Sequence, residues 1–94
     1  MLESQIQKSI INHLKGLPNC WAVKVMAASK NGTPDLLCCY EGRFVALEVK
    51  TPIGRTSAIQ DYQINQINLA GGSAHVVRSV DDVKAILTLL KESV

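Results

Sequence analysis

The sequence predicts a small, layered α/β domain. Its 94 residues fit one domain, and 47% hydrophobic residues suffice for one core, while 19% charged residues do not favour disorder. Two short runs in the middle of the chain, residues 36–40 and 44–47, are apolar on both faces, which is typical of strands covered on both sides. Helical patterns precede and follow them. We therefore expect a single domain over residues 1–94 with the element order α-β-β-β-α-β-α.

The first helix is predicted over residues 3–15, and residues 16–18 (Gly-Leu-Pro) end it. Its apolar residues recur every four positions: Leu2, Ile6, Ile10 and Leu14. At 100° per residue, Glu3 lies within about 20° of Ile10 and Leu14, on the apolar face. Two interpretations stay open. Glu3 is either a first-turn acid that favours the helix dipole or a carboxylate aimed at a functional site, directly or through water.

A strand is predicted over residues 20–27, followed by the polar loop 29–33, which leads into Pro34 and Asp35. Proline suits the first position of a strand, where its missing N–H costs least. Lys30 in this loop is either a phosphate contact or a solvated lysine.

The two central runs are predicted to form a hairpin, because Glu41 and Gly42 lie between them. If the turn is centred on these two residues, paired residue numbers sum to 83. Asp35 and Glu48 then become cross-strand neighbours with Cβ atoms about 5 Å apart. Alternation along the strand places Lys50 on the same face as Glu48.

Two facing carboxylates in apolar surroundings repel each other, and a divalent cation held by hard oxygen ligands relieves that repulsion. A lysine beside them can stabilise an anion or orient a water. This is the equipment for metal-assisted phosphodiester hydrolysis. The alternative is a structural Glu-Lys-Asp cluster at a strand end.

The loop 51–57 follows, and its Arg55 is either a phosphate clamp or a surface arginine. A second helix is predicted over residues 58–70. Gln60 completes a capping box with Ser57, or orients the lysine, a water or the DNA backbone, and the two roles are compatible. Tyr62 is expected in the core.

A short strand is predicted over residues 74–78 and a last helix after Ser79. That helix carries a stripe of apolar residues: Val83, Ile86, Leu87 and Leu90. His75 and His13 are expected to be structural.

The net charge of +2 does not by itself indicate nucleic-acid binding, so any basic surface must be local; Lys24, Lys30 and Arg55 are its candidates. No apolar run is long enough to span a membrane, and no signal peptide is expected. Three cysteines, two of them adjacent, suit neither a disulfide framework nor a zinc site. We expect buried free thiols in a reducing compartment.

The motifs Asn31-Gly32-Thr33-Pro34-Asp35, Glu48-Val49-Lys50 and Ser57-x-x-Gln60, with Glu3 in the first helix, resemble the VRR-NUC (virus-type replication-repair nuclease) family of the PD-(D/E)xK nuclease superfamily. The resemblance covers nearly the whole chain. It implies a restriction-endonuclease-like core, in which a mixed central sheet is flanked by helices.

The resemblance also implies the roles of the site residues. Asp35, Glu48 and the Val49 backbone carbonyl are expected to bind Mg²⁺ or Mn²⁺. Lys50 would position or activate the attacking water, and Glu3 and Gln60 would complete the site.

The implied function is that of a homodimeric endonuclease cutting branched DNA, such as four-way (Holliday) junctions, in the cytoplasm of a bacterial cell or phage-infected host. The alternatives are a flap, single-strand or sequence-specific nuclease on the same fold, or a catalytically idle nucleic-acid-binding module.

Overall fold

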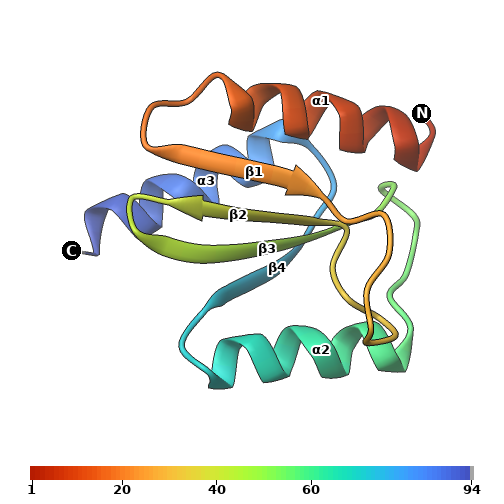
Figure 1. The fold of residues 1–94 in the computed structure, drawn as a ribbon. Helices are drawn as coiled ribbons and strands as arrows, with labels where there is room; N and C mark the ends of the chain where they lie inside the picture. Colours follow the sequence, from red (N-terminus) through yellow and green to blue (C-terminus); the bar gives the residue numbers. More distant parts are fainter. Residues whose placement is uncertain (94) are drawn as a thin grey trace.

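A four-stranded sheet lies between helices on both of its faces in the computed structural model, which describes residues 1–93 (Figure 1). The elements are α1 (Glu3–Lys15), β1 (Cys20–Lys24), β2 (Leu36–Tyr40), β3 (Arg43–Val49), α2 (Ala58–Leu69), β4 (Ser73–Val77) and α3 (Val80–Glu92). The strands lie in the order β1-β2-β3-β4, and only the pair of β3 and β4 is parallel. The predicted element order and the mixed sheet are confirmed.

The main core lies between the sheet and the pair α1 and α3, which cover the same face (Figure 1). Ile6, Ile10 and Leu14 of α1 are buried there, as are Val83 and Leu87 of α3. Leu2 is not part of this face, because it precedes the helix with extended backbone angles and its side chain is 67% exposed. The prediction is therefore wrong for Leu2 and confirmed for the rest of the α1 stripe.

The predicted hairpin register is confirmed. Tyr40 pairs with Arg43, and Leu36 pairs with Leu47, so the numbers sum to 83 along the ladder. Glu41 and Gly42 both have positive φ, 51° and 77°, which is the geometry of a type I′ turn. The twist of this turn matches the twist of the two strands, and the turn sets the register in which β2 pairs with β3.

The second face of the sheet is covered only in part, because α2 lies against β3 and β4. The half-buried residues of α2 form one narrow stripe: Gln60, Gln63, Ile64 and Ile67. Tyr62 points away from this stripe and is 55% exposed, so its predicted place in the core is wrong. Phe44 is 47% exposed and Cys39 is exposed, so the hairpin is not covered on both sides near its turn.

Three strands differ from their predicted ranges. β3 runs from Arg43 to Val49, beyond the predicted residues 44–47, because it also pairs with β4 as far as Val49. β1 ends at Lys24, short of the predicted residue 27, and its last paired residue on β2 is Leu36. Beyond this pair the Val25 N–H still donates to the Asp35 carbonyl at 2.9 Å, but neither residue belongs to a strand. β4 begins and ends one residue earlier than predicted. No helix within residues 1–93 is long and apolar enough to cross a membrane.

The three cysteines are free, as predicted, but their burial differs. Cys38 is buried, Cys20 is half-buried and Cys39 is exposed. Burial raises the pKa of the Cys38 thiol to about 12, which makes it unreactive. The expectation of buried thiols is therefore wrong for Cys39, which lies on the uncovered part of the sheet.

Candidate active site

Three carboxylates from separate segments meet at one end of the sheet. Glu3 lies in the first turn of α1, Asp35 directly precedes β2, and Glu48 lies near the end of β3. One ligand oxygen of each lies within 4.8 Å of the others. The hairpin register brings Asp35 beside Glu48, and α1 adds Glu3 because its apolar face rests on the sheet.

Asp35 is held in place by backbone contacts on several sides. Its Oδ2 accepts a hydrogen bond from the Val49 N–H at 2.8 Å, and its carbonyl accepts one from the Val25 N–H at 2.9 Å. The preceding loop is seated on α2, since a Cβ on Gly32 would lie 2.7 Å from the Ile59 carbonyl oxygen. Only glycine allows this approach, and Gly32 also has a φ of 80°.

Glu48 is a buried carboxyl, only 1% exposed. Burial, and then the neighbouring Asp35 carboxylate, raise the pKa of Glu48 to about 8 against the opposing effect of Lys50. A buried acid with so raised a pKa, beside a second acid, is typical of a functional site.

Lys50 and Gln60 both reach Glu48. The Lys50 Nζ lies 3.6 Å from Glu48 Oε2, and Gln60 Nε2 donates to the same oxygen at 3.4 Å. Gln60 Oε1 accepts from the Ser57 N–H at 2.9 Å, which closes the predicted capping box. Gln60 thus makes the predicted capping contact, and its second contact is with Glu48, which the sequence did not predict. Its expected role in orienting the lysine, a water or the DNA backbone stays a prediction.

Val49 contacts the carboxylates through its N–H, which donates a hydrogen bond to Asp35 Oδ2. The expected role of its carbonyl as a metal ligand stays a prediction.

The donor set suits a hard divalent cation. Glu3, Asp35 and Glu48 offer carboxylate oxygens close enough to share one ion, and these are ligands that Mg²⁺ and Mn²⁺ prefer. A bound cation would also offset the repulsion that raises the Glu48 pKa.

The three cations predicted to contact DNA are exposed and lie on segments at this end of the molecule (Figure 1). Lys24 ends β1, Lys30 lies in the loop before Asp35, and Arg55 lies in the loop before α2. Their role in binding stays a prediction.

Arg78 lies near the site, and the sequence did not predict a role for it. Its Nη1 donates to the carbonyls of Thr51 at 2.5 Å and Gly54 at 2.7 Å, so it braces the loop that follows Lys50. Its contacts join residues more than twenty positions apart, and the only signal was an arginine at the end of a predicted strand.

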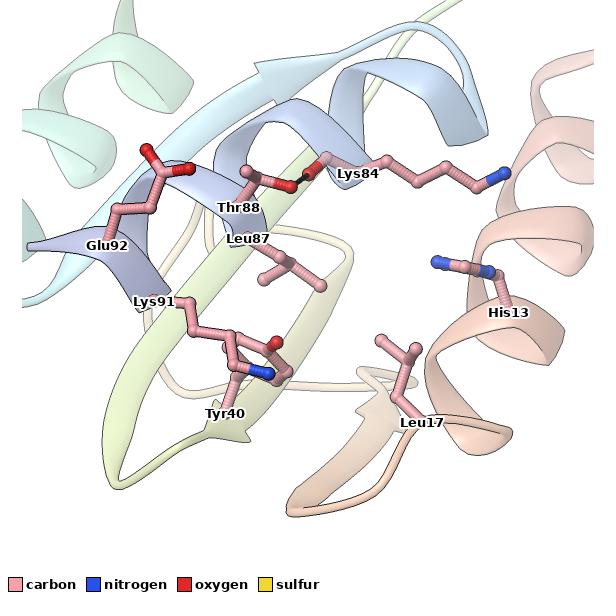
Figure 2. A pocket seen from close by; sticks show the side chains of 8 residues that line it. All are labelled: His13, Leu17, Tyr40, Lys84, Leu87, Thr88, Lys91 and Glu92. Atoms are coloured by element: carbon pink, nitrogen blue, oxygen red, sulfur yellow. Dashed lines mark hydrogen bonds between the residues drawn. The ribbon is translucent and has the colours of Figure 1, made fainter.

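The histidines lie outside the carboxylate cluster. The His75 Nε2 shares a hydrogen bond of 2.7 Å with Ser73 Oγ, and burial lowers its pKa. His13 lines a cavity of about 410 Å³ between α1 and α3, where it faces Lys84 (Figure 2). His13 lies ten positions along α1 from Glu3, a distance of about 15 Å, so the cavity is not part of the candidate site.

Comparison with known proteins gives structural relatives only. No family model matches the sequence, and no curated protein matches it significantly. A solved structure named "VRR_NUC domain" superposes with a TM-score of 0.77 at 23% identity, covering 92% of this chain and 94% of that chain. A second, named "VRR_NUC domain protein", gives 0.74 at 18% identity, covering 97% and 86%.

Fold and site together define a small α/β domain with a carboxylate centre at one end of its sheet. Its fold is that of the VRR_NUC domains, over nearly their whole length, as the sequence motifs implied.

Proposed function

We propose that this chain is a metal-dependent DNA endonuclease of the VRR-NUC family. The observation that carries the proposal is the meeting of Glu3, Asp35 and Glu48 within 4.8 Å, with the Lys50 ammonium 3.6 Å from Glu48. Neither a structural cluster nor an idle binding module requires a third carboxylate brought in from α1. The VRR_NUC fold of the chain supports the same chemistry.

Asp35, Glu48 and the Val49 carbonyl would hold Mg²⁺ or Mn²⁺, with Glu3 bound directly or through water. The ion would supply Lewis acidity and lower the pKa of a bound water. Lys50 orients the attacking water and stabilises the negative charge that develops on the phosphate oxygens. Gln60 fixes the orientation of Glu48. The oxygen of the attacking water bonds to phosphorus and loses a proton, the bond from phosphorus to the leaving oxygen breaks, and that oxygen takes up a proton.

Branched DNA, and four-way junctions in particular, is the proposed substrate, cut by a homodimer in the cytoplasm of a bacterial cell or phage-infected host. A C2 dimer has two sites related by the symmetry of two incisions across a junction. It also joins Lys24, Lys30 and Arg55 from two subunits, which offsets a net charge of only +2 per chain. Flap, single-strand and sequence-specific cleavage are the competing proposals.

Cleavage of a labelled four-way junction tests the function. We expect Mn²⁺-dependent paired incisions that Asp35→Asn abolishes and Lys50→Ala slows by roughly 100-fold with little loss of DNA binding. Full activity in EDTA would contradict the metal-dependent reaction. Cleavage of linear duplex as fast as junctions would replace the junction with another DNA substrate.

A further inference from the structure

A rigid turn projects from the loop directly after Lys50. Residues 51–54 form a β-turn, closed by a hydrogen bond of 3.1 Å from the Gly54 N–H to the Thr51 carbonyl. Pro52 occupies its second position, where the fixed φ of proline favours the turn. Arg78 donates to the Thr51 and Gly54 carbonyls, so the turn is tied to the end of β4 on both sides of its tip.

The residue at the tip of this turn, Ile53, is exposed to solvent. Ile53 is 92% exposed, the highest value among the large hydrophobic residues. Single exposed apolar residues are common on protein surfaces. Ile53 differs in its support, because a proline, a turn hydrogen bond and the half-buried contacts of Arg78 together hold the turn in place.

Ile53 also lies close to the carboxylates. Ile53 is the third residue after Lys50, so the chain limits the distance between their Cα atoms to about 10 Å, or about three base steps of DNA. Two other exposed apolar side chains lie on segments that lead into the site. Met26 is 84% exposed and Leu2, next to Glu3, is 67% exposed.

Resting on the proposed nuclease function, we propose that Ile53 is a wedge that inserts between bases beside the cleaved phosphate, with Arg78 as its positioning residue. Apolar side chains such as isoleucine and methionine separate base steps in this way in other DNA-bending proteins. Such a wedge favours DNA whose bases are already unpaired or unstacked, as at a branch point, because unstacking then costs less.

Nucleobases fit this feature better than a protein surface. A stable protein interface buries about 800 Å² on each partner, whereas the turn presents one side chain at its tip. Arg55, exposed two residues away, suits the phosphate backbone that accompanies a base.

Fluorescence of 2-aminopurine at the branch point of a four-way junction tests the wedge, because this base brightens when unstacked. The Lys50→Ala variant with Mn²⁺ keeps the DNA intact during the measurement. We expect a rise of about threefold on binding, which Ile53→Ser reduces by at least half and Ile53→Leu preserves. Arg78→Gln should reduce it as Ile53→Ser does. Leu89→Ser, which changes an exposed leucine on α3, is the matched control and should leave it unchanged.

Cleavage by the protein with Lys50 intact provides the second measurement. Ile53→Ser should slow junction cleavage about tenfold and leave hydrolysis of bis(p-nitrophenyl) phosphate, which has no bases, unchanged. Equal losses on both substrates would overturn the wedge, since the turn would then support the site itself. If Ile53→Ser gave the same rise in fluorescence as the protein with Ile53, the wedge would also be overturned. If Ile53→Ser in addition changed the molecular mass of the protein in solution, Ile53 would instead contact a second copy of the chain.

The two proposals fail separately. Cleavage without unstacking removes the wedge and leaves the nuclease. Unstacking without any cleavage by the unmodified chain removes the nuclease and leaves a base-wedging DNA-binding protein.

Discussion

Glu48 is the residue whose surroundings oppose its ordinary charge most strongly. It is almost fully buried next to Asp35, and its pKa is raised from 4.5 to about 8. In the metal-free protein at a pH between 4.5 and about 8, the Glu48 carboxyl therefore keeps its proton in the folded state and has lost it in the unfolded state. This contribution to the free energy of unfolding is fully present below pH 4.5, declines as the pH rises, and is lost above about pH 8.

Glu48→Gln should remove this pH dependence. At pH 8.5 in EDTA we expect the variant to be more stable than the unmodified protein by roughly 1–3 kcal/mol, because no charge must be buried. The variant should also lose the rise in melting temperature that Mn²⁺ gives the unmodified protein. Urea unfolding at pH 6 and 8.5 measures the first effect, with exposed Glu92→Gln as the control. Parallel pH slopes in all three proteins would show that Glu48 does not titrate in this range.

The loop before β2 is an element whose shape depends on one glycine. Residues 31–35 rest on the first two turns of α2, through Gly32 against Ile59 and through a hydrogen bond of 3.1 Å from Gln63 Nε2 to the Asn31 carbonyl. Asp35 ends this loop, so the seating of the loop on α2 sets where its carboxylate lies. A helix on one face of the sheet thus positions a residue of the site.

Gly32→Ala tests this dependence, with Gly42→Ala as a matched control. Both glycines have a φ near 80°, at 80° and 77°, but nothing lies within 4 Å of a Cβ on Gly42. Both variants should lose roughly 1 kcal/mol from the unfavourable φ, and Gly32→Ala about 1–3 kcal/mol more from its clash with Ile59. Only Gly32→Ala should weaken the Mn²⁺-induced shift, because Asp35 moves. Equal losses in both variants would mean that the loop yields without disturbing Asp35.

At the scale of the whole molecule, the second face of the sheet is half bare. α2 covers β3 and β4 only, which leaves a row of cross-strand neighbours open: Trp21, Cys39 and Phe44. Trp21 is 68% exposed, and within residues 1–93 its strand β1 pairs only with β2. A bare apolar row beside a free sheet edge favours the homodimer that we propose.

Trp21→Ser should therefore shift the protein from dimer to monomer. Trp21 is the largest exposed apolar side chain of the row, and aromatic residues dominate interface energies. Light scattering at micromolar concentration measures the mass, with Leu89→Ser on α3 as the control. A dimer that persists in Trp21→Ser would place the interface elsewhere, and an unmodified protein that is monomeric on junction DNA would contradict the dimer.

The sequence by itself determined those features that depend on near neighbours. The hairpin register followed from the two-residue turn at Glu41 and Gly42, and the pairing of Asp35 with Glu48 followed from the register. The contact of Gln60 with Ser57 followed from a spacing of three residues at a helix start. In these cases, backbone geometry limits the alternatives to a few, and the residue types distinguish among them.

Only the tertiary structure decided which faces are covered and which distant groups meet. Phe44 and Cys39 are exposed because α2 crosses two strands rather than four, and Tyr62 is exposed because α2 turns another side toward the sheet. No local pattern specifies that placement. The packing of α1 on the sheet places Glu3 beside Asp35 and Glu48, which the sequence had left open, and the contacts of Arg78 with residues 51 and 54 were not predicted. Such contacts depend on how whole elements fit together. These contacts form because whole elements bury apolar surface against one another. Burial of apolar surface is non-directional, so no short stretch of sequence predicts which contacts result.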